Sequence, residues 1–409
     1  MSFLSSGNKE RFGALIDIGS GSVLVAILRS DAAKTYPEII WSKREYSPLR
    51  NVSSLDESAK HVMTALVNAL MALDSEGRKA FSEKTGQTKL PETQVTIAAP
   101  WSYTITKNIS YAHSEPFTIS DELIEELLRT SHKKVDEDIT EHERAHQLGL
   151  TIISRSVIGL AANGYNLLRP NNQSAKALRV VEASAVAQDY LVTAIKEAGG
   201  KVLPDSTLRL YSFIMIFYSI IRDIHPESTE YCLVDITYEA TELGIVRDGI
   251  LTYTTHAPYG SFSLAREIAA VLGTPLEEAF GYLHDSDLSA ALSSYSVEKQ
   301  AEVEEIFTAY RKRLTDLFHE TGDALSIPKR VFLHGNLHTE AFYAEQVGEA
   351  AKAATKASHA VYPVSKELID KNYPKEMGLE VEKMVMDTAL LISAQFFHMR
   401  EYHSRFEHY

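Results

Sequence analysis

Two segments that lie far apart in this chain follow the same plan: an apolar strand, an aspartate, a tight turn and a second apolar strand. The first segment, residues 13–28, has Asp17 before the turn Gly19–Ser22. The second segment, residues 231–246, has Asp235 at the matching position. Two such hairpins that face each other could hold a phosphate chain from both sides. The repeat therefore favours a fold in which one α/β unit is built twice.

The composition is that of an ordinary globular protein of more than one domain. The chain has 409 residues, too many for a single core, with 44% hydrophobic and 23% charged residues. The net charge of −14 argues against nucleic acid as a partner, because such binding needs a basic surface. The single cysteine, Cys232, excludes a disulfide framework and fits a reducing cytoplasm.

The longest apolar run, Leu210–Ile221, is too short to cross a bilayer as a helix, which takes about 20 residues. We expect a buried helix over 208–221 and, at most, peripheral association with a membrane. Before this run, the pattern predicts a helix over Ala183–Ala198, which ends at two glycines, and then a short strand over Lys201–Leu203.

The two turns have the chemistry of a phosphate site. Backbone N–H groups at a tight turn can bind an anion, and small residues such as Gly19, Ser20, Gly21 and Ser22 leave room for it. An aspartate before each turn could hold water on Mg²⁺, which prefers few protein ligands. Many β-hairpins contain such a turn, so either motif by itself is weak evidence for a phosphate site.

Together with a third segment, Val331–Asn336, the two hairpins resemble the nucleotide motifs of the actin-like ATPase superfamily, in the order phosphate 1, phosphate 2 and adenosine. The chain more closely resembles FtsA, a bacterial division protein, and its relative PilM of type IV pilus assembly. This resemblance implies an α/β, two-lobed actin-like fold, which is a duplicated ribonuclease-H-like fold, with an inserted SHS2-type subdomain. It divides the chain into a first lobe (12–90 and 181–226), the insert (91–180), a second lobe (227–398) and a C-terminal helical extension (399–409).

The resemblance also implies a site for ATP and Mg. Asp17 and Asp235 would position the metal. The residues expected to contact the nucleotide are Asp17, Gly19, Ser20, Gly21, Ser22, Asp235, Thr237, Thr241, Gly335 and Asn336.

The chain departs from the family pattern around this cleft. Tyr238 and Glu239 stand where the second phosphate turn usually has small residues, and a carboxylate there would repel a polyphosphate. Phe280 and Leu283 stand where a Glu and a Lys often meet the nucleoside, and the adenosine turn has one glycine, Gly335. These changes predict weak or lost ATP binding. The alternative is that the hydroxyls of Thr237 and Thr241 replace the lost backbone contacts and that ATP still binds.

As a function, the resemblance implies a cytoplasmic scaffold at the inner face of a bacterial membrane. The main expectation is an FtsA-like adaptor that joins cytoplasmic and inner-membrane division proteins and binds the FtsZ tail. One alternative is a PilM-like pilus-assembly adaptor that binds a membrane protein's cytoplasmic peptide. Another is an active ATP-binding protein that polymerises through its insert.

Two further segments carry recognisable patterns. His142, Glu143 and His146 match the H-E-x-x-H zinc motif, but Ile152 replaces a third His and the motif lies in a charged stretch, which favours a surface helix or loop over a zinc hydrolase. The C-terminal stretch 399–409 keeps helical spacing of apolar residues. It predicts an extension of the last helix, with a partner-binding helix or a membrane anchor as alternatives.

Overall fold

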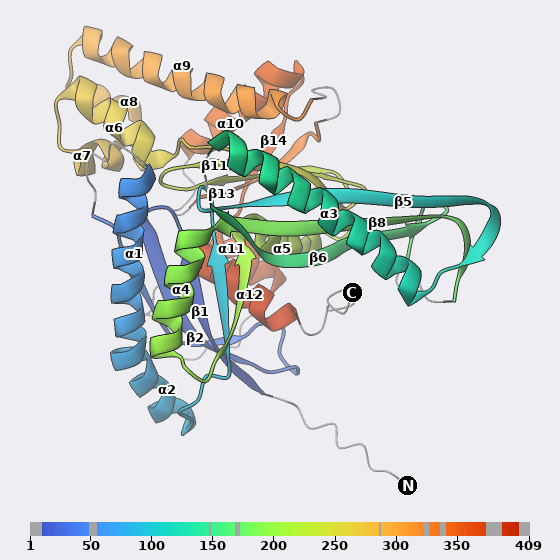
Figure 1. Ribbon diagram of the computed structural model, residues 1–409. Coiled ribbons are helices and arrows are strands. Elements are labelled where there is room, and N and C mark those ends of the chain that lie inside the picture. Colours follow the sequence, from blue (N-terminus) through green and yellow to red (C-terminus); the bar gives the residue numbers. More distant parts are fainter. Residues whose placement is uncertain are drawn as a thin grey trace.

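The computed structural model describes residues 10–48, 55–146, 149–167, 172–285, 288–322, 327–335, 341–373 and 387–400. Two five-stranded sheets form the centres of two lobes, and a third, antiparallel sheet projects from the body (Figure 1). The expected C-terminal extension lies outside the described residues, apart from Met399 and Arg400.

The sheet of the first lobe has the order β3-β2-β1-β4-β9, in which β2 runs antiparallel to the other four strands. Its strands are β1 (Arg11–Ile18), β2 (Ser22–Ser30), β3 (Glu38–Tyr46), β4 (Glu92–Ile97) and β9 (Thr207–Ser212). The strands β1 and β2 read as nearly continuous apolar runs because helices cover both faces of the sheet.

The second lobe repeats this topology. Its order is β12-β11-β10-β13-β14, and β11 is the antiparallel strand. Its strands are β10 (Tyr231–Ile236), β11 (Thr241–Arg247), β12 (Ile250–Ala257), β13 (Arg330–Gly335) and β14 (Ala360–Pro363). The same five-stranded ribonuclease-H-like sheet thus occurs twice, and the predicted two-lobed actin-like fold is confirmed.

Helices on the outer face of each sheet build a separate core. On the first lobe they are α1 (Leu55–Ala72), a π-helical turn (Leu73–Gly77), α2 (Arg78–Thr85) and α4 (Asp189–Val202). On the second lobe they are α6 (Ser261–Leu272), α7 (Leu276–Tyr282), α8 (Leu288–Leu292), α9 (Val297–His319) and α10 (Ala341–Thr355). Capping residues set several of these ends: Ser296 accepts a hydrogen bond from the Lys299 N–H at the start of α9, and Gly273 ends α6 with φ of 72°.

The layer between the lobes consists of α5 (Phe213–Ile224) and α12 (Thr388–Met399), with α11 (Lys366–Asn372) beside them. The predicted buried helix corresponds to α5, in which residues 213–218 are all buried because both lobes pack against it, whereas Ser219, Arg222 and Asp223 are not buried. One core therefore joins residues of both sheets, such as Leu15 and Leu233, through α5 and α12.

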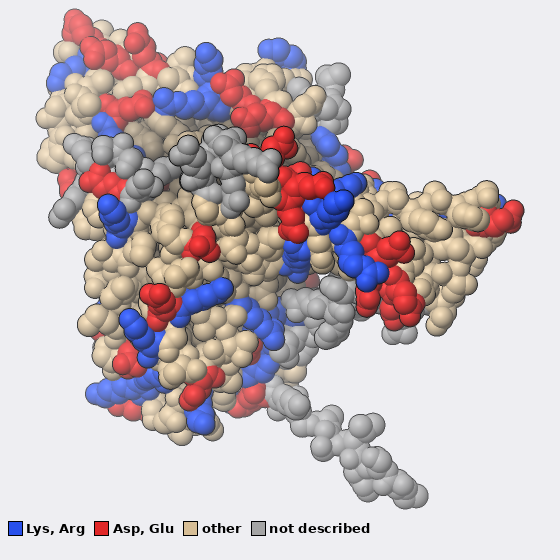
Figure 2. Space-filling model, viewed as in Figure 1, with Lys and Arg blue, Asp and Glu red and all other residues tan. Residues whose placement is uncertain are grey.

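The insert is an antiparallel sheet of order β5-β8-β6-β7 with one long helix on its face. Its elements are β5 (Ser102–Thr118), α3 (Asp121–His146), β6 (Leu150–Ala162), β7 (Tyr165–Asn166) and β8 (Ser174–Gln188). It projects from the body with acidic and basic side chains mixed at its base (Figure 2). Gly159 of β6 lies against Ile250 of the second lobe, where a Cβ would come within 2.5 Å of the Ile250 side chain.

Three local predictions of secondary structure differ from the structure. Residues 183–188, expected to begin a helix, are the end of β8, because the β8 pairing with β5 and β6 overrides the helical propensity of this alanine-rich stretch. Residues 201–203 complete α4 and its C-cap instead of forming a strand, and 208–212 belong to β9. The boundary placed at residue 91 falls before β4, which pairs with β1 and β9, so the insert sheet starts at Ser102 and ends at Gln188.

Candidate functional site

The two hairpin turns that define the expected nucleotide cleft touch each other. The Ser20 hydroxyl donates to the Thr237 hydroxyl over 2.8 Å and accepts from the Glu239 backbone N–H over 2.9 Å. All three residues are buried. The hydroxyl that was expected to face a phosphate therefore bonds to the opposite turn.

Tyr238 covers the glycine at the centre of the first turn. A Cβ placed on Gly21 would come within 2.5 Å of the Tyr238 ring, so the ring occupies the space directly above this glycine. Tyr238 is held by Phe262, with ring centroids 4.2 Å apart, and by Phe280, at 5.9 Å. An aromatic cluster thus fills the second lobe's side of the cleft, and it includes the Phe280 that replaces a polar residue of the family pattern.

The carboxylate of Glu239 forms an ion pair with Arg266. Arg266 of α6 donates to it through two nitrogens, at 2.9 and 2.5 Å, and the Ser263 hydroxyl lies 3.4 Å away. Glu239 is 5% exposed, so this bidentate pair is largely shielded from water. The negative charge that the sequence places in the second turn is neutralised from within the second lobe.

Asp17, one of the two predicted metal positions, lies beside an arginine. Arg44 of β3 is 3.7 Å from Asp17 and 2.6 Å from Asp387, and its Nη1 donates to the Ser22 hydroxyl over 2.6 Å. Asp387 also caps the start of α12 through the Leu390 N–H. The buried Arg44 guanidinium therefore contacts the carboxylates of Asp17 and Asp387 as well as Ser22, the last residue of the first turn.

Asp235, the second predicted metal position, pairs with a histidine. Its Oδ1 lies 2.8 Å from Nδ1 of His334, and Nε2 of the same ring lies 3.2 Å from the Thr388 hydroxyl at the start of α12. Asp235 and His334 are each 1% exposed. Gly335 follows at the end of β13, opposite Ile236, and Asn336 lies outside the described residues.

The hydroxyls of Thr237 and Thr241, which the sequence offered as replacement phosphate ligands, have protein partners. The Thr237 hydroxyl lies within hydrogen-bond distance of the Ala99 and Ala240 carbonyls, at 3.2 and 3.0 Å. The Thr241 hydroxyl donates to the Tyr259 carbonyl over 2.9 Å. Both threonines are buried, so these bonds satisfy groups that would otherwise be costly to bury.

Two of the buried carboxyls here, those of Asp17 and Glu242, have raised pKa values. Burial, with smaller contributions from Asp387 and Asp235, raises the pKa of Asp17 from 3.8 to about 6, although Arg44 and His334 oppose the shift. Burial also raises the pKa of Glu242 well above its usual value, and the charge of Asp235, its cross-strand partner, adds to that shift. Burial therefore opposes the charged form of both Asp17 and Glu242.

As placed, these residues do not fit Mg²⁺ and a polyphosphate. Asp17 already lies 3.7 Å from Arg44, and Asp235 already lies 2.8 Å from His334. Mg²⁺ would need the oxygens of both carboxylates together with several waters. Within the described ranges, no group of three or more His, Cys, Asp or Glu side chains is arranged to hold a metal ion.

Three partners in this site were missed from the sequence, namely Arg44, Arg266 and Asp387. The alternation of buried and less buried residues along β3 did give a sign of Arg44. Ser42 and Arg44 are both buried and lie two residues apart on one face of the strand, so a charged residue stands in the inward phase. The other two come from helices distant in sequence, and no local pattern connects them to the turns.

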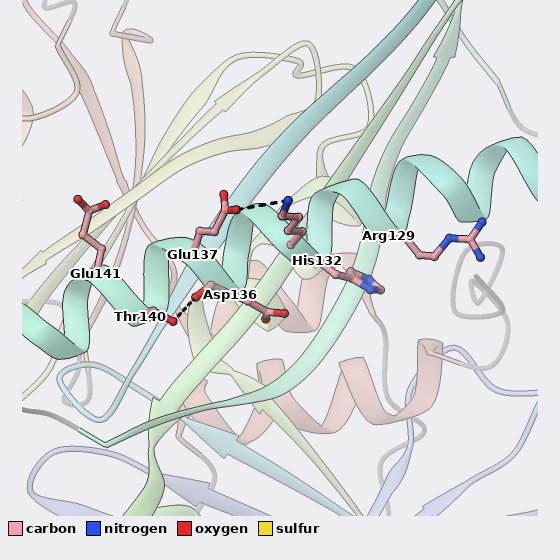
Figure 3. A pocket seen from close by; sticks show the side chains of 7 residues that line it. Arg129, His132, Asp136, Glu137, Thr140 and Glu141 are labelled. Atoms are coloured by element: carbon pink, nitrogen blue, oxygen red, sulfur yellow. Dashed lines mark hydrogen bonds and ion pairs between the residues drawn. The ribbon is translucent and has the colours of Figure 1, made fainter.

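A shallow hollow lies on the outer face of α3 (Figure 3). It has a volume of about 660 Å³, and one helix alone lines it, through Arg129, His132, Lys133, Asp136, Glu137, Thr140 and Glu141. Lys133 and Glu137, with side chains 80% and 64% exposed, lie 3.9 Å apart. This is a solvated charged face, and such exposed pairs contribute little energy. The zinc motif at 142–146 follows at the end of α3, and its side chains lie outside the described residues.

A cavity of about 420 Å³ lies between the insert sheet and the helices of the inter-lobe layer. Strands β6 and β8 form one wall, and α5 and α12 form the other. Met215, Phe396 and Met399 give it an apolar surface, whereas Arg222 and Asp223 bring charges to it. Its volume is in the range of ligand sites, and both apolar and polar residues line it.

Comparison with known proteins gives distant structural similarities. No protein-family model matches the chain, and no curated protein matches it in sequence. Among solved structures, the PilM-PilN type IV pilus biogenesis complex is similar at 13% identity, covering 88% of this chain and 89% of that chain, with a TM-score of 0.46. The ethanolamine utilization protein EutJ from Carboxydothermus hydrogenoformans is similar at 9% identity, covering 86% and 84%, with a TM-score of 0.42.

A protein of actin-like ATPase fold and unknown function from Bacteroides thetaiotaomicron is similar at 10% identity, covering 89% of this chain and 93% of that chain, with a TM-score of 0.39. The fold assignment rests on the repeated topology of the two sheets. No helix in the described part of the chain is both long and apolar enough to span a membrane.

Proposed function

We propose that this protein is a non-catalytic scaffold of actin-like fold, in which the nucleotide cleft has become a structural contact between the lobes. The observation that carries the proposal is the direct contact of the two turns, through Ser20, Thr237 and the Tyr238 ring above Gly21. Arg44 and His334 occupy the neighbourhood of the carboxylates that a metal would need. In this proposal the predicted site residues keep their positions but serve stability instead of ATP binding.

Isothermal titration of Mg-ATP into the purified chain tests this part. We expect no binding up to millimolar nucleotide, both for the native chain and for Asp235→Ala. Micromolar binding that is lost in Asp235→Ala would overturn the proposal and would restore the ATP-binding alternative.

Of the adaptor roles that the sequence resemblance implies, we favour the pilus-type role, binding of a membrane protein's cytoplasmic peptide. The cavity between the insert and α5 supports a peptide-binding role. Met215, Phe396 and Met399 offer an adaptable apolar surface for a side chain of an extended peptide. The hydroxyls of Ser154, Ser156 and Ser219 line the same cavity and could bond to a peptide backbone.

Fluorescence anisotropy with labelled peptides tests the peptide site. The probes are synthetic cytoplasmic segments of membrane proteins encoded next to this gene. Met215→Lys places a charge in the cavity and should abolish binding, whereas Met71→Lys, at a residue that is 63% exposed on α1, should leave it unchanged. Equal binding by both variants would exclude this cavity as the peptide site.

A further inference from the structure

The turn between β10 and β11 is rigidly attached to the second lobe. The N–H groups of Ser261 and Phe262, at the start of α6, donate to the Thr237 and Tyr238 carbonyls over 3.0 and 2.8 Å. Gly260 approaches the turn so closely that a Cβ there would lie 2.3 Å from the Thr237 carbonyl oxygen. Together with the Glu239–Arg266 pair, these contacts couple the turn to α6.

The facing turn is attached equally firmly to the first lobe. The Gly19 N–H donates to the Ser22 carbonyl over 3.0 Å, and the Trp101 indole donates to the Gly19 carbonyl over 3.1 Å. Arg44 holds the Ser22 hydroxyl from β3. The first turn is therefore fixed by groups from β3 and from the bend after β4.

The contacts between these two rigid turns cross from one lobe to the other. They comprise the Ser20–Thr237 and Ser20–Glu239 hydrogen bonds and the packing of the Tyr238 ring on Gly21. Thr237 also bonds to the Ala99 carbonyl, in the bend after β4 of the first lobe. All lie in the buried interior, so separating the lobes would break the bonds and expose the aromatic ring together.

We infer that the turn 237–241 acts as a built-in ligand of the first lobe and holds the two lobes in one arrangement without any added ligand. We call this set of contacts the turn clasp, made by Ser20, Gly21, Thr237, Tyr238 and Glu239. The inference rests on the proposed function in one respect, that no nucleotide separates the turns. It goes further because it assigns the clasp a conformational role, keeping the shape of the scaffold constant when a partner binds.

Distance measurement between spin labels tests the clasp in the full chain. Cysteines replace Lys60 on α1 and Glu277 on α7, two exposed positions on opposite lobes, and the native Cys232 is buried and should stay unlabelled. Double electron–electron resonance should give one narrow distance distribution that does not change when Mg-ATP is added.

Two variants should loosen the clasp by different means. Ser20→Ala with Thr237→Val removes the crossing hydroxyls, and Gly21→Ala pushes against the Tyr238 ring; both should broaden the distribution at least twofold. Thr252→Val, which removes a hydroxyl bonded within the second lobe, and Gly200→Ala, at a position with no atom within 4 Å of the added Cβ, should leave it narrow.

The outcomes separate the two ideas. A broad distribution in the native chain without ligand, or variants as narrow as their controls, would overturn the clasp. A broad native distribution that narrows with Mg-ATP would overturn both the clasp and the non-catalytic scaffold. A narrow native distribution with broadened clasp variants supports the inference even if calorimetry were to detect ATP binding.

Discussion

Tyr238 lies with its ring directly on Gly21, so a residue of the second lobe fills the space that a small turn in the first lobe would leave for a phosphate. A glycine is needed here because the ring approaches so closely. Its backbone angles do not require one, since Gly21 does not have a positive φ. Adding a methyl group therefore tests the contact with little effect on the turn itself.

We predict that Gly21→Ala lowers the free energy of unfolding by about 1–3 kcal/mol, the usual cost of overpacking. Urea unfolding followed by circular dichroism measures it. In a Tyr238→Ala background the same substitution should cost almost nothing, because the ring is gone. Gly200→Ala, in the open helical position on α4, should be neutral or stabilise by about 0.5–1 kcal/mol. An equal loss in both Tyr238 backgrounds would show that the two residues do not interact.

A second prediction concerns the buried guanidinium of Arg44. Arg44→Met leaves Asp17 and Asp387 without a cation in a site where Arg44 itself is only 8% exposed. Removing one member of a buried ion pair typically costs about 3–5 kcal/mol, which we expect in urea unfolding.

The matched control is Arg29→Met on the neighbouring strand β2. Arg29 pairs with Glu10 and Glu38, but its side chain is 37% exposed, so the loss should be under about 1 kcal/mol. A further Asp387→Asn substitution should recover part of the stability lost in Arg44→Met. A loss in Arg44→Met no larger than in Arg29→Met would contradict the role given to Arg44.

The sequence predicted the repeated hairpins, the insert and the buried helix because each leaves a local or ordered pattern. Apolar runs that end near Asp17 and Asp235 mark the two central strands, and the largely apolar run 210–221 marks a buried helix. The same reasoning failed at 183–188, where alanine and valine suit either structure and only pairing with distant strands decides.

The state of the cleft was only partly predictable. Tyr238 and Glu239 stand out in the sequence because they replace small residues, and this led to the expectation of weakened ATP binding. The partners that make these residues tolerable, Arg266 for Glu239 and Phe262 for Tyr238, become neighbours only through the packing of α6 on the second turn. Long-range contacts of this kind have no counterpart in local sequence.

A third prediction follows from the raised pKa of Asp17. The folded chain holds a proton on Asp17 up to pH about 6, whereas the unfolded chain releases it near 3.8. This contribution to stability is fully present below the unfolded value and is lost as the pH rises through about 6. A shift of about two units corresponds to about 3 kcal/mol.

Asp17→Asn removes this titration while keeping the shape of the side chain. The difference in unfolding free energy between Asp17→Asn and the native chain should therefore grow in favour of the variant between pH 4 and 6.5. Asp205→Asn, at an exposed position, controls for the change in net charge. A difference that stays constant over this range would show that Asp17 does not gain its proton on folding.

The last prediction compares the buried Glu239–Arg266 ion pair with an exposed ion pair. Glu239→Gln keeps the size of the side chain but removes the charge that receives two hydrogen bonds from Arg266. Since hydrogen bonds to charged groups contribute about 1.5–3 kcal/mol, we expect a loss of that size in urea unfolding. Glu267→Gln, whose partner Arg313 is 44% exposed, should lose less than about 1 kcal/mol.

Because the Tyr238 ring still covers Gly21, Glu239→Gln should gain no affinity for Mg-ATP in calorimetry. Appearance of ATP binding in this variant would mean that the charge of Glu239, and not the contact of the turns, keeps nucleotide out.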